Sequence, residues 1–414
     1  MTSVVKSKRL IFDVDEPAID DGVVVVDGDR VNAVGTSADV TIPPGATVYD
    51  CGDDTLMPGL IDAHAHITMN LGRGGDIGAQ SNLDMVEATL QGVANLRTDL
   101  AAGVTTMRTL GAPGLIEPRF KAAIARGEID GPRLQIAIRL LRPTHGTASF
   151  VSTAVDGPDE IRKVVRDTFS LGAQWIKMMV TNVMQGDTFE DYLRGDMTTV
   201  SSFTREEVRT VISEAHSLGM KVAAHAIGGP AMRWAIEEGI DTIEHADILE
   251  AEDVEVFGRH QAYLSDPNLQ LFCDPEERIL RRTYGRPTEA WWRERTDGAR
   301  ETLRRYLPEI IARGVKVCLA VDSMHGCLWR EVGHLAEISG STQVALRAVT
   351  KNTAEMLGLA DEIGAIKPGY LADIISVKSD PFSDPWALEH VRFVMQAGTR
   401  MDTRIRKDQA GACA

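Results

Sequence analysis

The chain has 414 residues, and its 44 lysines and arginines are outnumbered by 60 aspartates and glutamates, which gives a net charge of −16. This acidic balance excludes a general binder of nucleic acid or of an anionic membrane, because both need a basic surface. Hydrophobic residues make up 43% and charged residues 25%, as in globular proteins, which excludes a disordered or fibrous chain. The five cysteines include no Cys-x-x-Cys pair, so no cysteine-based zinc site is indicated. We find neither an apolar signal core near residue 1 nor an 18-residue apolar run, and therefore expect a cytoplasmic protein.

In chain order, the first 50 residues show short β-rich runs separated by Asp-Gly, Gly and Pro. From residue 56 the pattern changes to apolar, strand-like runs that alternate with segments of helical period. The strand-like runs are 56–67, 103–111, 133–141, 174–180, 221–226, 241–246, 262–266 and 316–323. The clearest helical segments between them are 84–103, 158–173, 204–219 and 229–239. Residues 364–380 and 391–401 return to the β-rich texture of the N-terminus.

Alternating strands and helices in this number favour an α/β fold, a (β/α)8 TIM barrel whose parallel strands close into a ring. An open, doubly wound sheet is the rival, but no G-x-G-x-x-G follows a strand. We expect a barrel over 58–362 and a small β-sandwich domain that combines 1–57 with 363–414. Residues 267–300 are longer than an ordinary βα connection and predict a helical insertion or lid, in which Trp291 and Trp292 are expected to pack.

Polar residues stand at one end of several apolar strands. His64 and His66 are two apart in the first strand, so both side chains lie on one face. A His-x-His pair is weak on its own, and each polar residue taken alone is explained equally well as a satisfied core group. However, Lys177, His225, His245 and Asp322 also lie in or at the end of strands, where a parallel barrel carries its site. The set therefore predicts a metal centre.

The ligand types define the chemistry of that centre. Imidazoles with one carboxylate suit zinc, and manganese, iron or cobalt are alternatives. A carbamate formed from Lys177 and CO₂ would supply two oxygens that bridge two metals, and a metal-bridging hydroxide is a strong nucleophile at neutral pH. Asp322 would take its proton and pass it to a leaving nitrogen.

Three segments resemble motifs of the amidohydrolase superfamily, and together they extend the resemblance over nearly the whole chain. LMPGLIDAHAHI (56–67) is similar to its first-strand motif, and 202–247 resembles the imidazolonepropionase and prolidase-like (metal-dependent dipeptidase) branch. NTAEMLGLADEIGAIKPGYLADI (352–374) resembles the return to that family's β-sandwich. The resemblance implies two divalent metal ions, with zinc favoured. Their implied ligands are His64, His66 and Asp322 for the first ion, His225 and His245 for the second, and a carboxylated Lys177 between them.

The substrate loops depart from that branch. VTNVMQGDTFEDY (180–192) replaces its TGG-V stretch, and LRPTHGTAS (141–149) replaces a Gly-Gly-His loop. We therefore expect hydrolysis of a C–N bond of amide, carbamate or urea type in a small molecule, such as an N-acyl amino acid or aryl amide. The candidate substrate-binding residues are His145, His325, Arg142 and Tyr192.

Three other functions remain open. One is an Xaa-Pro-type dipeptidase or carboxypeptidase. Another is a mononuclear deaminase of a heterocycle, although such deaminases usually place a glutamate where this chain has Gly228. The third is a non-catalytic scaffold, which the six ligand-type residues argue against. Because relatives commonly assemble, we also expect a homo-oligomer.

Overall fold

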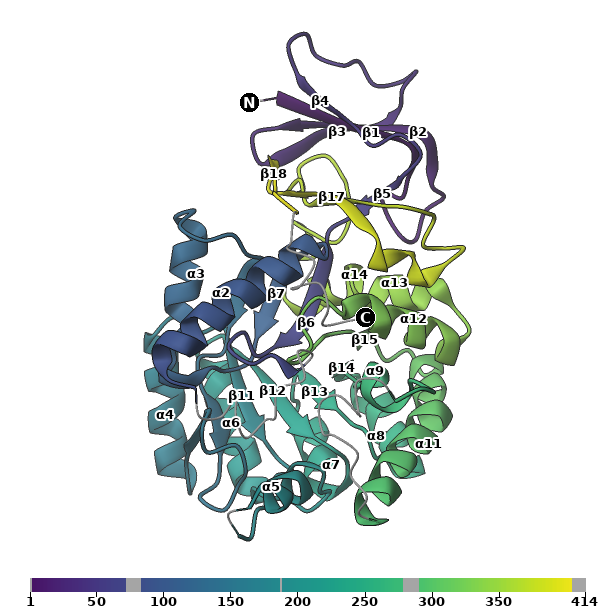
Figure 1. Cartoon of the computed structure of the whole chain (residues 1–414). Helices are drawn as coiled ribbons and strands as arrows, with labels where there is room; N and C mark the ends of the chain where they lie inside the picture. The colour runs from purple at the N-terminus through teal and green to yellow at the C-terminus, as the bar shows by residue number, and fades with distance from the viewer. Residues whose placement is uncertain (1, 72–82, 187, 278–289, 404–414) are drawn as a thin grey trace.

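The computed structural model describes residues 2–71, 83–186, 188–277 and 290–403. Figure 1 shows two parts, a barrel surrounded by helices and a smaller β-sheet part beside one end of it. Both chain ends contribute to the smaller part, because the first strands of the chain lie next to its last strands (Figure 1).

The barrel is built from parallel strands that follow one another around its wall. These strands are β6 (Leu60–Ala65), β7 (Val104–Thr109), β8 (Arg133–Ile136), β11 (Trp175–Met179), β12 (Lys221–Ala226), β13 (Thr242–His245), β14 (Tyr263–Ser265) and β15 (Val317–Cys318). They form a three-stranded sheet, β6-β7-β8, and a seven-stranded sheet, β10-β9-β11-β12-β13-β14-β15, in which β9 is Leu140–Arg142 and β10 is Ser152–Ala154.

Backbone hydrogen bonds bridge the two gaps between these sheets. Gln174 N donates to Ile136 O at 3.0 Å, which joins β8 to the start of β11. Asp322 N donates to His64 O at 2.9 Å, and Ala63 N donates to Leu319 O at 3.1 Å, which joins the end of β15 to β6. The wall is therefore closed, as the predicted TIM barrel requires.

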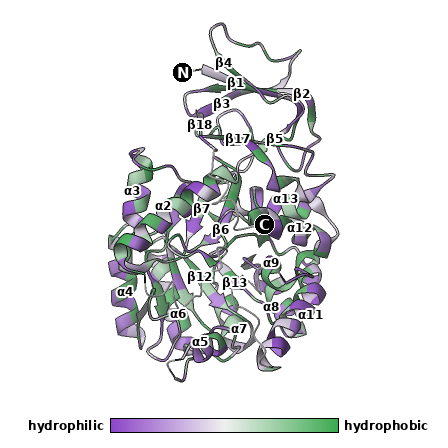
Figure 2. Ribbon diagram, in the orientation of Figure 1, coloured by the Kyte–Doolittle hydropathy of each residue, from purple (hydrophilic) through white to green (hydrophobic). Residues whose placement is uncertain are grey.

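Helices cover the outside of the barrel because their sequences are amphipathic and capped. The helix α6 (Arg205–Ser217) begins at Thr204, which forms a capping box with Glu207, and it buries Val208, Val211, Ile212 and Ala215. Figure 2 shows hydrophilic and hydrophobic residues alternating along α4 (Pro158–Ser170) and α11 (Ala290–Ala312). The other barrel helices are α2 (Met85–Ala101), α3 (Glu117–Ala125), α5 (Phe189–Asp196), α7 (Gly229–Glu237), α8 (Ala251–His260), α9 (Leu269–Phe272), α12 (Leu328–Ser339), α13 (Thr342–Ala348) and α14 (Lys351–Met356).

The smaller part is one curled eight-stranded sheet with the order β18-β17-β16-β5-β1-β2-β3, in which β4 also pairs with β1. Its strands are β1 (Thr2–Leu10), β2 (Ile19–Asp27), β3 (Arg30–Thr36), β4 (Thr47–Asp50), β5 (Thr55–Pro58), β16 (Ile374–Val377), β17 (Val391–Gln396) and β18 (Thr399–Arg400). The sheet folds over its own core, since the rings of Tyr49 on β4 and Phe393 on β17 lie 5.5 Å apart.

We propose the domain division predicted from the sequence, in which residues 1–57 and 363–414 form one domain and residues 58–362 form the other. The strands that both termini contribute to one sheet support this division. The expected insertion at 267–300 includes α9 and the first half of α11, and its residues 278–289 lie outside the described part of the chain.

Candidate metal centre

The six candidate ligands converge at the carboxyl ends of the barrel strands. His64 lies in β6 and His66 directly after it, Lys177 in β11, His225 in β12, His245 at the end of β13, and Asp322 after β15. His245 and Asp322 have positive φ angles of 77° and 52°. Non-glycine residues adopt such angles at a cost, and they persist where the surrounding structure holds them, often at functional sites.

The nitrogens of the first histidine pair face each other. Nε2 of His64 and Nε2 of His66 are 3.3 Å apart, and Asp322 Oδ1 lies 3.9 Å from the latter. Nδ1 of His66 lies 2.9 Å from the carbonyl of Gly111, so that nitrogen is the donor and Nε2 carries a lone pair. Nδ1 of His64 faces two carboxylates, so its Nε2 also carries a lone pair. Two lone pairs beside a carboxylate repel one another unless a cation lies between them, so this donor set fits a divalent metal.

A second histidine pair adjoins the first. The rings of His225 and His245 have centroids 4.9 Å apart, and the ring of His245 lies 5.3 Å from that of His64. Lys177 Nζ lies 3.4 Å from His64 Nε2, and the lysine is only 1% exposed. The buried amine therefore stands beside the first pair, where a modified lysine would reach a metal.

Burial shifts the pKa values of the candidate ligands. It lowers the pKa of His64 and of His225 to about 3, so both rings are neutral at physiological pH, as metal ligands must be. Burial also lowers the pKa of Lys177 to about 8, which leaves a fraction of the free amine to react with CO₂. The pKa of Asp322 is lowered despite burial, because His64, His66 and His245 surround it.

A cavity opens onto this cluster. Five of the six candidate ligands line it, and His64 lies behind them. The rest of the wall is mainly apolar and includes Met69, Leu140, Phe150, Val151, Met179, Tyr192, Met197, Ile227, Leu271, Phe272 and Met324. Lys177 is the one lysine or arginine among the described residues that line it.

A buried ion pair supports the cluster from inside the barrel. The Arg108 guanidinium donates to Glu244 Oε1 at 2.7 Å and to Thr242 Oγ1 at 3.0 Å, and it stacks on the Trp175 ring. The other oxygen of Glu244 lies 3.3 Å from His64 Nδ1. Burial raises the pKa of Glu244, but Arg108 and His64 outweigh it and hold the pKa well below its usual value.

The four predicted substrate-binding residues lie in different places. Tyr192 lines the cavity opposite Phe150, with ring centroids 6.3 Å apart. His145 is exposed, and Arg142 is occupied in its own loop by Ser152 Oγ and the carbonyls of Pro143 and Thr144. His325 is fully buried behind His66 and pairs with Asp99. For these four residues a substrate contact stays a prediction.

Several acidic residues that were not predicted from the sequence also lie at the cluster. Asp196 and Asp247 line the cavity, while Glu244 and Asp266 contact His64. Burial, together with the charge of Asp322, raises the pKa of Asp196 to about 7. Asp266 ends the strand-like run 262–266, so the strand-end rule that selected Asp322 would have selected it too.

The chain is similar to known proteins in sequence and in fold. The amidohydrolase family profile matches residues 55–405. The chain is 26% identical over 370 residues to an uncharacterized Mycobacterium tuberculosis protein (85% of this chain, 86% of that one) and 26% identical over 393 residues to imidazolonepropionase from Sphingopyxis alaskensis (86% of each chain). It is also 25% identical over 378 residues to ochratoxinase from Aspergillus niger (81% of this chain, 74% of that one). A solved Xaa-Pro dipeptidase with bound methionine superimposes with a TM-score of 0.82 at 24% identity, over 97% of this chain and 100% of that one.

The chain belongs to the amidohydrolase family and is a metal-dependent hydrolase of carbon–nitrogen bonds. Its fold is the TIM barrel with a small terminal domain that the solved relatives share. None of the helices in the described part of the chain combines the length and the apolar composition needed to cross a membrane.

Proposed function

We propose that this chain is a binuclear hydrolase whose first ion is held by His64, His66 and Asp322 and whose second is held by His225 and His245. A carboxylated Lys177 would help to hold both ions, and zinc is the proposed metal. The observation that carries the proposal is the pair of facing imidazole lone pairs, 3.3 Å apart, beside a buried lysine. The facing lone pairs call for a cation between them, and the buried amine is favourable once it becomes a carbamate anion that such cations neutralise.

When bound, two divalent ions would supply an activated water and Lewis acidity toward the scissile carbonyl. Asp322 then moves the proton, taking it from the nucleophile and giving it to the leaving nitrogen. Ser323 Oγ donates to Asp322 Oδ1 at 2.9 Å, which fixes the carboxylate for this transfer.

The cavity wall supports a small, largely apolar substrate. Methionine and aromatic side chains dominate that wall, and Lys177 is the one cation among the described residues that line it. A substrate carboxylate would find no arginine partner among the described residues of this wall, whereas an uncharged aryl or alkyl group would bury apolar surface there. We therefore favour neutral amides, carbamates and ureas over N-acyl amino acids and dipeptides.

The geometry disfavours a heterocycle deaminase. The position where such deaminases usually carry a glutamate is Gly228, and a Cβ there would lie 2.1 Å from the carbonyl oxygen of Ile248. No side chain fits at this position without moving the backbone. The chain therefore lacks the glutamate that such deaminases usually carry there.

A hydrolysis screen with metal analysis tests the proposal. The purified chain, loaded with zinc, should bind close to two ions and should cleave neutral aryl amides, carbamates or phenylureas faster than N-acyl amino acids or dipeptides. Ammonia release from a heterocycle with one bound ion would overturn it in favour of the deaminase. Activity confined to dipeptides would overturn the substrate class.

We also propose a cytoplasmic homo-oligomer. The exposed side chains of Val86 and Leu90 on α2, 67% and 66% accessible, support an assembly that covers this face. Light scattering after size exclusion measures the mass, and fractionation of the source cells measures the location.

A further inference from the structure

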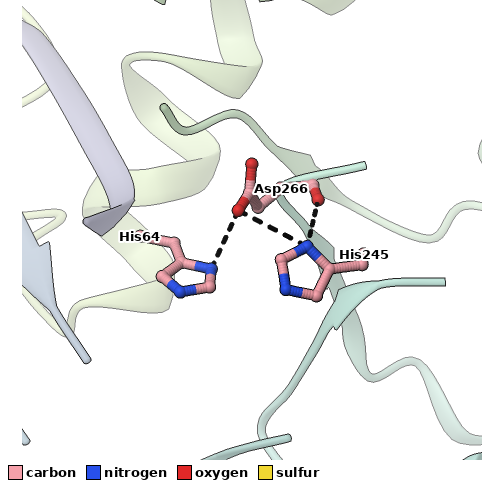
Figure 3. A group of neighbouring side chains, drawn as sticks. All are labelled: His64, His245 and Asp266. Atoms are coloured by element: carbon pink, nitrogen blue, oxygen red, sulfur yellow. Dashed lines mark hydrogen bonds and ion pairs between the residues drawn. The ribbon is translucent and has the colours of Figure 1, made fainter. Parts of the chain in front are cut away.

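Asp266 is a buried carboxylate that lies beside one histidine of each pair. Its Oδ2 lies 2.9 Å from Nδ1 of His64 and 3.6 Å from Nδ1 of His245. The carbonyl of the same residue lies 3.2 Å from His245 Nδ1, and the side-chain amide nitrogen of Asn268 lies 2.9 Å from the same ring nitrogen. Figure 3 shows the carboxylate between the two rings, with the other nitrogen of each ring pointing away from it.

The backbone holds Asp266 in this place. Its φ is +51°, a conformation that costs free energy for a residue with a side chain. Asp266 N donates to Cys318 O on the next strand at 3.0 Å, which ties the residue to β15. The side chain is 1% exposed and is not among the residues that line the cavity, so it does not meet a substrate.

The neighbouring carboxylate, Glu244, does not duplicate this arrangement. Its Oε1 is bound by Arg108, and its Oε2 lies farther from His64 Nδ1, at 3.3 Å. Asp266 is thus the carboxylate nearer to His64, and it also lies 3.6 Å from a histidine of the second pair. A carboxylate on the Nδ1 side of an imidazole fixes the tautomer and raises the basicity of Nε2 toward a metal.

We propose that Asp266 is a positioning residue shared by the two ion sites, orienting His64 for the first ion and His245 for the second. The inference rests on the binuclear centre proposed above. A single buried side chain would then set the affinity of both ions without contacting either the ions or the substrate.

Zinc affinity of the full-length chain tests this assignment. Wild type, Asp266→Asn and Asp266→Ala are each equilibrated with zinc against a chromogenic chelator. We expect both ions to be weakened in both variants, by about 10–100-fold for Asp266→Ala and by less for the isosteric Asp266→Asn, whose amide oxygen still accepts a hydrogen bond. Cobalt-substituted spectra should change for both sites.

A matched control is Glu331→Gln. Glu331 is also a fully buried acid, but its carboxylate accepts the backbone N–H groups of Leu269 and Gln270, so zinc affinity should stay at the wild-type value. Wild-type affinity for either ion in Asp266→Asn would overturn the shared role. If wild-type protein itself binds fewer than two ions, the binuclear centre fails instead, so the two failures are distinguishable.

Discussion

His325 and Asp99 form a buried pair behind the metal centre, with His325 Nδ1 2.6 Å from Asp99 Oδ2. Asp99 comes from α2, and its other oxygen accepts the backbone N–H of Gly326 at 2.8 Å. His325 Nε2 lies 3.3 Å from the carbonyl of His66. The pair therefore joins the loop after β15 to α2 and to the backbone of His66.

Asp99→Asn should destabilise the protein markedly. Burial lowers the pKa of His325, but Asp99 outweighs this and raises it, so removal of the charge should lower the pKa again and remove a buried, charge-assisted hydrogen bond. We expect the free energy of unfolding to fall by about 1.5–3 kcal/mol. Urea denaturation at pH 6 measures it, and Glu128→Gln, in an exposed pair with Arg126, is the control that should change it by less than about 0.5 kcal/mol. Equal effects of the two substitutions would contradict the prediction.

Lys177→Ala should abolish turnover and be rescued by small acids. Without the bridging carbamate the loss should exceed about 100-fold, more than is typical of residues that only support a ligand. Acetate or propionate should restore part of the rate, since a free carboxylate supplies the same two oxygens. Steady-state rates with and without added acid measure this. Lys221→Ala is the control that should retain activity, because Lys221 lies at the start of the neighbouring strand β12, away from the candidate ligands. Unchanged turnover of Lys177→Ala would exclude a carbamate.

Phe150→Ala should weaken substrate binding more than catalysis. Removing a ring from the apolar wall exposes substrate surface worth about 1–2 kcal/mol, so KM for an aryl substrate should rise by roughly 5–30-fold while kcat changes little. Phe169→Ala removes an exposed ring of α4 that does not line the cavity and serves as the control, with KM near the wild-type value. A fall in kcat at constant KM in Phe150→Ala would place the ring in the chemical step instead.

Acid should weaken the contact between the small β-sheet and the barrel helices. Asp13, after β1, accepts from Lys351 at 3.0 Å and pairs with Lys367 at 2.6 Å. Burial raises the pKa of Asp13, but hydrogen bonds from Lys367, the Asp15 backbone and Lys351 outweigh it, so the folded-state pKa lies below the ordinary value of 3.8. This stabilisation is therefore complete above about pH 4 and is lost as the pH falls through the folded-state pKa.

Asp13→Asn should then cost about 1–3 kcal/mol at pH 7, and the difference from wild type should shrink below pH 4. Urea denaturation across pH 3–7 measures it. Glu16→Gln, an exposed neighbour, should shift the free energy of unfolding by less than about 0.5 kcal/mol at every pH. A difference for Asp13→Asn that is as large at pH 3 as at pH 7 would refute the assignment.

Much of the fold was predictable because it depends on local patterns. Capping residues such as Thr204, apolar strands and helical periodicity all act over a few residues, and their alternation implied the barrel that the structure contains. Strand-end position likewise gave six candidates: His64, His66, Lys177, His225, His245 and Asp322. In the structure five of them line one cavity and His64 lies behind it.

Partners across the barrel were not predictable in this way. Arg108 reaches Glu244 over 136 residues of chain, and the Asp266 carboxylate reaches back to His64 in the first barrel strand. The sequence also presents His325 as an open loop residue, whereas folding buries it against Asp99.

The sequence by itself determined the acidic, globular chain, the alternation of strands and helices, and the residue types that can hold metal. Only the tertiary structure decided which carboxylates stand behind the histidines, which loop residues reach the cavity, and how apolar its wall is. The physical reason is that hydrogen-bond and packing partners depend on how the strands register around the ring, and that register is a property of the closed barrel rather than of any one segment.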